Sequence, residues 1–248
     1  MVIRDSQYQA MTQAVQAHAE KELVEHCRQY APRLFQAAGE DGVHQAVVLG
    51  LSRARAYGFS DEPQIRLYLD TMLVLGSHFD TDPQFPWAAE ILQDKFSRPH
   101  VRALVLHRDL CLYIDRVMGP RRGYVREALD RVSKLPEELP RLERRNAEHL
   151  REWLVLLYPQ KSDDLTDEQV ARTAATATYV ARQFGVAGGD GIIGSVLLVF
   201  GHGATYDPLY PWISGVLRDP LITSPEGRLQ RLYDRLRVYA GQARKYLA

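Results

Sequence analysis

Hydrophobic residues recur at helical spacing along almost the whole chain, and the alternation typical of β-strands is scarce. Ile65, Leu69, Met72 and Leu73, for example, share one face of a segment that predicts a helix over 62–76. The same spacing predicts further helices at 5–30, 40–57, 86–94, 99–118, 124–133, 142–157, 167–184, 190–201, 211–217 and 225–247. The pattern therefore predicts an all-α protein.

Glycine, proline and short polar residues mark the expected helix ends. Gly58 is expected to end the helix before it in a left-handed conformation, which glycine adopts without steric cost. Thr166 and Gln169 have the spacing of a capping box. Asp82 and Asp207, each followed by proline, are interpreted as helix caps, and residues 162–167 as a polar loop.

The chain also contains an internal repeat, because residues 55–94 align with residues 182–219 with one short gap. The signature positions are Gly58, Gly76, Asp82, Pro83, Pro86 and Trp87 in the first copy, and Gly185, Gly201, Asp207, Pro208, Pro211 and Trp212 in the second. An internal repeat indicates how the whole chain is organised. We expect two pseudo-repeated helical modules, 1–118 and 141–248, joined by a connecting segment at 119–140 and packed into one compact body. The two tryptophans are interpreted as core residues of their own modules rather than as a partner-binding surface.

Composition and charge narrow the classes of function. The chain has 248 residues, of which 46% are hydrophobic, and its 31 Lys and Arg balance 31 Asp and Glu. A net charge of zero gives no global attraction to nucleic acid or to an acidic membrane. Two distant cysteines, no secretory signal and no apolar run long enough to span a bilayer lead us to expect a cytoplasmic protein.

One glycine motif resembles a nucleotide-binding fingerprint but lacks its context. Residues 189–194 match GxGxxG, which binds a pyrophosphate only when a strand precedes it. The preceding residues, 171–184, predict a helix, so we interpret the motif as a connection between helices and expect no cofactor.

Two further groups could carry chemistry. His78, Asp80 and Asp82 could ligate a metal, but the second copy has Gly203, Thr205 and Asp207 there, which favours a structural role. His202 could act as a base with Asp207, although a helix-terminal histidine bonded to a loop carbonyl is the favoured interpretation. We therefore expect no catalytic residue and no bound metal.

Two stretches carry a family resemblance: FGHGATYDPLYPWI at 200–213, and YGFSDEPQIRLYLDTMLVLGSHFDTDPQFPWAAEIL at 57–92. They resemble a family of uncharacterised bacterial proteins encoded beside type VI secretion spike, effector-adaptor and toxin genes. The resemblance extends over nearly the whole chain and brings no catalytic set with it. It implies a non-enzymatic protein that binds a type VI effector, adaptor or toxin.

The resemblance leaves two roles open. The first is an adaptor or co-chaperone that loads an effector onto the spike, and the alternative is a cytoplasmic immunity protein that neutralises a cognate toxin. Partner contacts are expected where the two copies differ, namely the loop 187–191, the segment 119–140 and the helix before Lys21.

Overall fold

The computed structural model describes residues 5–137, 147–186 and 188–246. Its helices, in chain order, are α1 (Asp5–Tyr30), α2 (Pro32–Ala56), α3 (Glu62–Leu75), α4 (Pro86–Gln93), α5 (Pro99–Tyr113), the π-helix η1 (Ile114–Met118), the 3-10 helix η2 (Pro120–Arg122), α6 (Gly123–Ser133), α7 (Ala147–Leu157), α8 (Pro159–Asp164), α9 (Asp167–Gln183), α10 (Asp190–Phe200), α11 (Pro211–Leu217) and α12 (Pro225–Tyr246). These residues contain no β-strand, which confirms the predicted all-α class.

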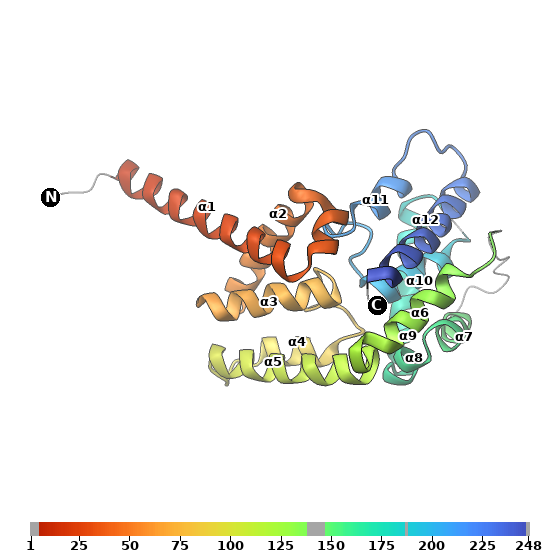
Figure 1. The fold of residues 1–248 in the computed structure, drawn as a ribbon, viewed down its shortest axis with the longest axis horizontal. Helices are drawn as coiled ribbons and strands as arrows, with labels where there is room; N and C mark the ends of the chain where they lie inside the picture. Colours follow the sequence, from red (N-terminus) through yellow and green to blue (C-terminus); the bar gives the residue numbers. More distant parts are fainter. Residues whose placement is uncertain (1–4, 138–146, 187, 247–248) are drawn as a thin grey trace.

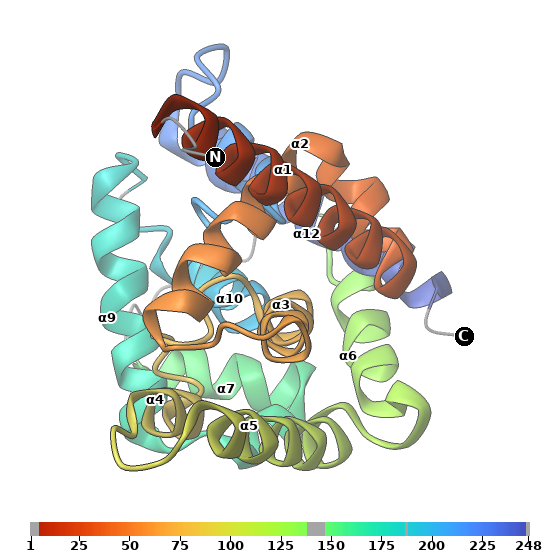
Figure 2. The ribbon, with the colours of Figure 1, turned by 90° about the vertical axis from the view of Figure 1, so that its left-hand side faces the viewer.

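The helices form two groups that meet side by side (Figure 1). In the first half, α1 packs on α2 and α3, and α5 packs on α3 and α4. In the second half, α10 packs on α9, α7 and α12, while α6 lies along α12. Figure 2 shows α1 crossing one edge of the first half, with α4 and α5 at the opposite edge. The first turns of α1 project beyond the body (Figure 1).

One continuous hydrophobic core runs through both halves. It includes Tyr68 and Phe79 from the first half and Ile193 and Leu197 from the second, all of them inaccessible to solvent. A smaller cluster lies under α7 and α8 and consists of Leu150, Leu154, Leu165, Val170 and Leu198. The halves therefore share their main core, and the body is compact.

Several predicted helix ends are confirmed. Gly58 has φ 77° directly after α2, and the Phe59 N–H donates to the Ala54 carbonyl oxygen at 2.9 Å. Gly185 has φ 64° after α9, where the Val186 N–H reaches the Ala181 carbonyl oxygen at 2.8 Å. Both ends are Schellman motifs that satisfy carbonyls left over by the helix. The predicted capping box of Thr166 and Gln169 opens α9.

Other boundaries differ from the prediction. Helix α2 includes a stretch before Gly39 that was not predicted, but the backbone at Gly39 is not helical, with φ 76° and ψ 166°, so the helix predicted to start near residue 40 begins after it as expected. The helix predicted at 99–118 is α-helical only to Tyr113 and finishes as the π-helix η1. The predicted polar loop at 162–167 is partly wrong, since Pro159 opens the short helix α8, in which Lys161 and Ser162 are buried. Of the predicted helices, residues 142–146 and Leu247 lie outside the described residues.

The segment predicted to connect the modules contains η2 and α6. Helix α6 packs along α12, and the Tyr233 hydroxyl donates to the Pro136 carbonyl oxygen at 2.9 Å. This part of the chain is thus attached to the second half, while residues 138–140 lie outside the description. The domain division at 118 and 140 stays a prediction. None of the described helices combines the length and apolar character needed to cross a membrane.

Candidate functional site

The most polar part of the interior is where two loops meet between the halves. Residues 76–85 join α3 to α4, and residues 201–210 join α10 to α11. We call their contact the loop crossing. Gly76 and Gly201 end α3 and α10 with φ 97° and 90°, a conformation that disfavours other residues. A β-carbon on Gly76 would lie 2.6 Å from the Phe200 carbonyl oxygen, so the close approach of the backbones also requires glycine there.

Two buried carboxylates connect the loops by bonding across the crossing. Asp82 Oδ2 accepts the His202 N–H at 2.6 Å, and Asp207 Oδ2 accepts the Ser77 N–H at 2.8 Å. The Ser77 hydroxyl also donates to Asp207 Oδ1 at 2.6 Å. Burial raises the pKa of Asp207 above its usual value, against the lowering effect of the Ser77 hydrogen bonds. Each carboxylate therefore holds the loop of the opposite half.

The expected capping role of these two aspartates is wrong. Helices α4 and α11 begin at Pro86 and Pro211, and their N-cap residues are Phe85 and Tyr210. Asp82 Oδ1 instead accepts the N–H of Gln84, and Asp207 Oδ1 that of Leu209, both at 2.9 Å. A carboxylate that bonds the backbone two residues on forms a turn before the helix starts.

The possible metal ligands His78, Asp80 and Asp82 point to different partners. Asp80 accepts hydrogen bonds from Arg53 Nη1 at 2.7 Å and from the Tyr57 hydroxyl at 3.0 Å, both in α2 or at its end. His78 lies edge-on to Tyr206, with ring centroids 4.7 Å apart. Burial, together with the positive charge of Arg53, lowers the pKa of His78 to about 4, so its imidazole is neutral at pH 7. In the described parts of the chain, no three His, Cys, Asp or Glu side chains are grouped as a metal site needs.

His202 pairs with a different acid from the expected one. Its Nδ1 lies 3.5 Å from Asp82 Oδ2, whereas Asp207 bonds Ser77 on the other side of the crossing. Its Nε2 lies 3.4 Å from the Thr81 hydroxyl. The favoured interpretation, a bond from His202 to a loop carbonyl, is therefore corrected to contacts with a carboxylate and a hydroxyl. Both acids are engaged by protein groups, so the arrangement is suited to holding the loops together.

The sequence analysis did not identify one buried lysine of the site. Lys161 in α8 is 7% exposed, and its ammonium donates to the Leu198 carbonyl oxygen near the end of α10. The amide of Gln84 donates to the adjacent Leu197 carbonyl oxygen at 3.0 Å. Burial lowers the pKa of Lys161 to about 8, and the charge of Asp82 opposes that shift. Nothing in the polar run 160–164 signals burial, because the partner groups come from other parts of the chain.

Two arginines that the sequence analysis did not identify make matching hydrogen bonds to backbone carbonyl groups, one in each half. Arg102 donates to the Tyr57 carbonyl oxygen at 2.6 Å and to that of Leu92 at 2.5 Å. Arg228 donates to the Phe184 carbonyl oxygen at 3.3 Å and to that of Ile222 at 3.0 Å. The sequence does contain a signal for this pair, because each arginine lies three residues after the proline that opens its helix, α5 or α12.

The remaining signature residues lie at helix starts and in the packed loops. Pro86 and Pro211 open α4 and α11, and Pro83 and Pro208 lie within the loops of the crossing. Trp87 and Trp212 are half-buried and pack against the main core. Their ring centroids lie 6.3 Å from Tyr113 and 6.0 Å from Tyr239, so each contacts an aromatic ring of its own half.

Only Gly189 of the GxGxxG motif lies in the connection from α9 to α10, and residues 190–194 form the first turns of α10. The interpretation of the whole motif as a connection between helices is therefore wrong, whereas the helix predicted before it is confirmed. A β-carbon on Gly189 would lie 2.3 Å from Leu229 Cδ2, and one on Gly194 would lie 3.0 Å from Leu150 Cδ1. Close packing against other helices accounts for these two glycines. Ala187, in the same loop, lies outside the described residues.

Comparison with known proteins gave no significant match to this chain among family models, curated proteins or solved structures.

Proposed function

We propose that this protein is a non-enzymatic, protein-binding accessory factor, an adaptor or co-chaperone that helps load a type VI secretion effector in the cytoplasm. The observation that supports the proposal most is that protein groups engage the buried carboxylates at the loop crossing. Asp80, Asp82 and Asp207 each accept at least two hydrogen bonds from protein groups. Such a cluster stabilises a scaffold, and it leaves the exposed surfaces of the helices for recognition.

We further propose that the body consists of two pseudo-repeated helical modules. The supporting observation is that aligned positions make matching contacts: Gly76 with Gly201, and Asp82 with Asp207. Beyond the aligned stretches, Arg102 and Arg228 bond the matching carbonyl oxygens of Tyr57 and Phe184. A duplicated scaffold with one shared core presents a rigid surface, which an adaptor needs to hold an effector in one orientation.

The test is co-expression with the spike, adaptor and toxin proteins encoded beside members of the resembled family. An accessory factor is expected to copurify with the adaptor or the effector, and its deletion should block toxin delivery without harming the producing cell. Direct binding to the toxin together with rescue of a poisoned cell by this chain alone would instead establish the immunity role. Copurification with none of these proteins would reject both roles.

A further inference from the structure

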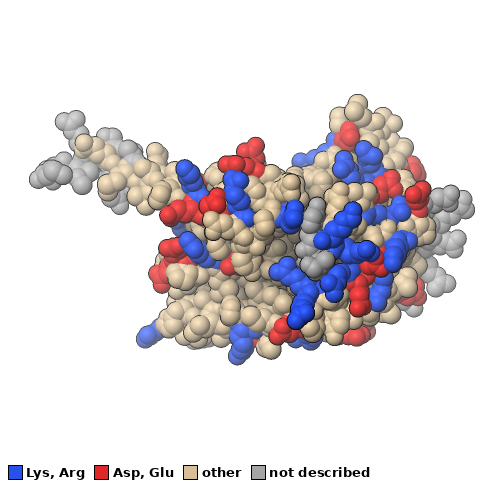
Figure 3. Space-filling model, viewed as in Figure 1, with Lys and Arg blue, Asp and Glu red and all other residues tan. Residues whose placement is uncertain are grey.

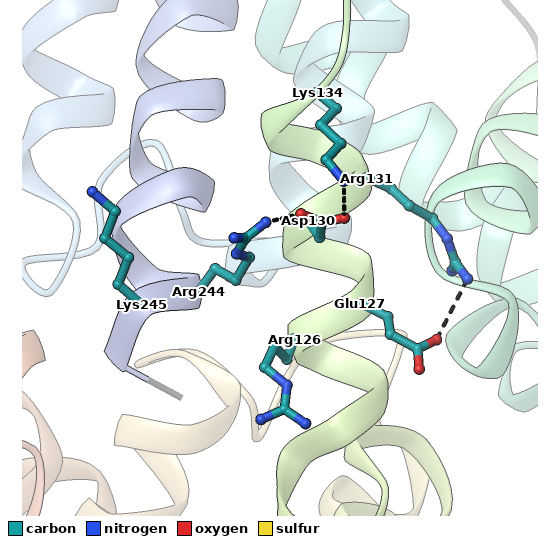
Figure 4. A pocket seen from close by; sticks show the side chains of 7 residues that line it. All are labelled: Arg126, Glu127, Asp130, Arg131, Lys134, Arg244 and Lys245. Atoms are coloured by element: carbon teal, nitrogen blue, oxygen red, sulfur yellow. Dashed lines mark hydrogen bonds and ion pairs between the residues drawn. The ribbon is translucent and has the colours of Figure 1, made fainter. Parts of the chain in front are cut away.

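Helices α6 and α12 border an open groove of about 650 Å³ on the surface of the second half. Figure 3 shows Lys and Arg side chains gathering on this half of the molecule. The groove is lined by Arg126, Glu127, Asp130, Arg131, Lys134, Arg244 and Lys245 (Figure 4). Five of these seven side chains are cationic and two are anionic, so the groove carries an excess of three positive charges.

The two acids of the groove are already neutralised. Asp130 lies between Lys134, whose ammonium is 2.7 Å away, and Arg244, with which it also forms an ion pair. Glu127 pairs with Arg131 at 3.5 Å. Arg126 and Lys245 form no ion pair with any described residue (Figure 4). The excess charge is therefore concentrated on side chains that are free to meet a ligand.

Two more arginines stand where α6 begins. Arg121 and Arg122 have φ 50° and 58°, and both side chains are exposed. A left-handed backbone at a residue other than glycine costs on the order of 1 kcal/mol, and such strain recurs at binding sites. Arg122 precedes Arg126 by about one helical turn. Arg121 and Arg122 thus add positive charge at the start of α6, outside the residues that line the groove.

The geometry points to a binding site for an acidic segment of a protein partner in this groove, and this inference rests on the proposed function. Arginine binds carboxylates through two parallel hydrogen bonds, so Arg126 with Lys245 would engage Asp or Glu side chains. A nucleic-acid backbone fits less well, because it needs a continuous track of cations, and Glu127 and Asp130 interrupt this one.

Fluorescence anisotropy with a labelled octaglutamate peptide tests the site on the full-length protein. The peptide should bind saturably, and added salt should weaken it. The double substitution Arg126→Glu with Lys245→Glu should weaken binding about tenfold or more, because it reverses the two unpaired charges. The matched control, Lys95→Glu with Arg98→Glu, makes the same charge change at exposed positions between α4 and α5, and it should change binding by less than about twofold.

Three outcomes would overturn the inference: no saturable binding of the peptide, equal loss in the control variant, or tighter binding of oligothymidylate or tripolyphosphate that the groove variant loses. Its failure is distinguishable from failure of the proposed function. If the effector copurifies equally well with the groove variant, the function stands and the groove is rejected. If the peptide binds in the groove but no type VI protein copurifies, the function alone is rejected.

Discussion

Asp82 and Asp207 each accept hydrogen bonds from backbone groups of the opposite half, and both are almost inaccessible to solvent. Removing such an acceptor leaves buried N–H groups without a partner, which costs more than the net value of the hydrogen bond itself. The same local turn, a carboxylate bonded to the N–H two residues on, occurs at the surface at Asp94. Comparing Asp82 with Asp94 therefore separates the cost of losing the local turn from the cost of losing the bond between the halves.

We expect Asp82→Ala to lower the free energy of unfolding by about 3 kcal/mol, because the N–H groups of His202 and Gln84 lose their acceptor. Asp94→Ala, at an exposed turn within one loop, should lower it far less. Urea unfolding followed by circular dichroism measures both. Equal costs for the two variants would show that the bond across the loop crossing adds nothing to stability.

Lys161 should give stability a distinctive pH dependence. Its pKa in the folded protein is about 8, below the value of 10.5 for a free side chain. Between these two values the unfolded chain binds a proton that the folded protein has released, so the contribution of Lys161 to stability rises with pH.

The unfolding free energy of the wild type minus that of Lys161→Met should therefore increase by about 2 kcal/mol from pH 8 to pH 10. Urea titrations at several pH values measure this difference, and the subtraction removes the titration of tyrosines and cysteines common to both proteins. Lys95→Met, at an exposed position, serves as the matched control for the change of side chain. A difference for Lys161→Met that does not change with pH would mean that its ammonium keeps an ordinary pKa.

At the scale of the helix and its ends, most of the fold could be predicted because the signals are local. Proline at the first turn, glycine after the last and the capping box at Thr166 act within a few residues of their own position. The helical stretch at 32–38 and the π-helical end of α5 were not predicted. The π-helix η1 packs on α6 and α8, and spacing within one helix does not show such contacts.

The candidate site was harder to predict for the same physical reason. The repeat identified Asp82 and Asp207 as matching positions, but it could not show that each bonds the other half. His202 was paired with Asp207 because the two are near in sequence, whereas the crossing brings Asp82 to it. The burial of Lys161 was not predicted, because it depends on α10 and the ring of Phe85.

Substitution of a glycine that ends a helix tests whether the local backbone conformation there requires glycine. Gly76→Ala should destabilise the protein by about 3 kcal/mol, because it combines a left-handed backbone with a clash against the Phe200 carbonyl oxygen. Gly215, within α11, has open space around its α-carbon and an ordinary backbone conformation, so Gly215→Ala should stabilise by roughly 0.5 to 1 kcal/mol. Thermal and urea unfolding measure both, and a neutral Gly76→Ala would contradict the geometry of the crossing.

At the scale of the whole molecule, the halves share one core and exchange buried hydrogen bonds. Neither half can lose its structure without exposing apolar surface and unpaired polar groups of the other. The projecting turns of α1 and the groove beside α6 lie outside this shared region, so they can serve recognition without weakening it.

We therefore expect the protein to unfold in one cooperative transition despite its length. Differential scanning calorimetry should give a single peak whose van't Hoff and calorimetric enthalpies agree. Asp82→Ala should move this peak to lower temperature without splitting it. Two resolved peaks, in either protein, would mean that the halves are stable independently of each other.

The exchange of hydrogen bonds also has a consequence during synthesis on the ribosome. The donor to Asp82 lies 120 residues further along the chain, and Asp207 lies 130 residues after Ser77. At about 5–20 residues per second, the ribosome needs roughly 6 to 26 seconds to make that stretch. During this interval the loop 76–85 of the first half has no partner loop, and the carboxylate of Asp82 lacks its donor from the second half. A nascent chain that stops early is therefore not a smaller version of the protein but an unfinished one, open to proteases.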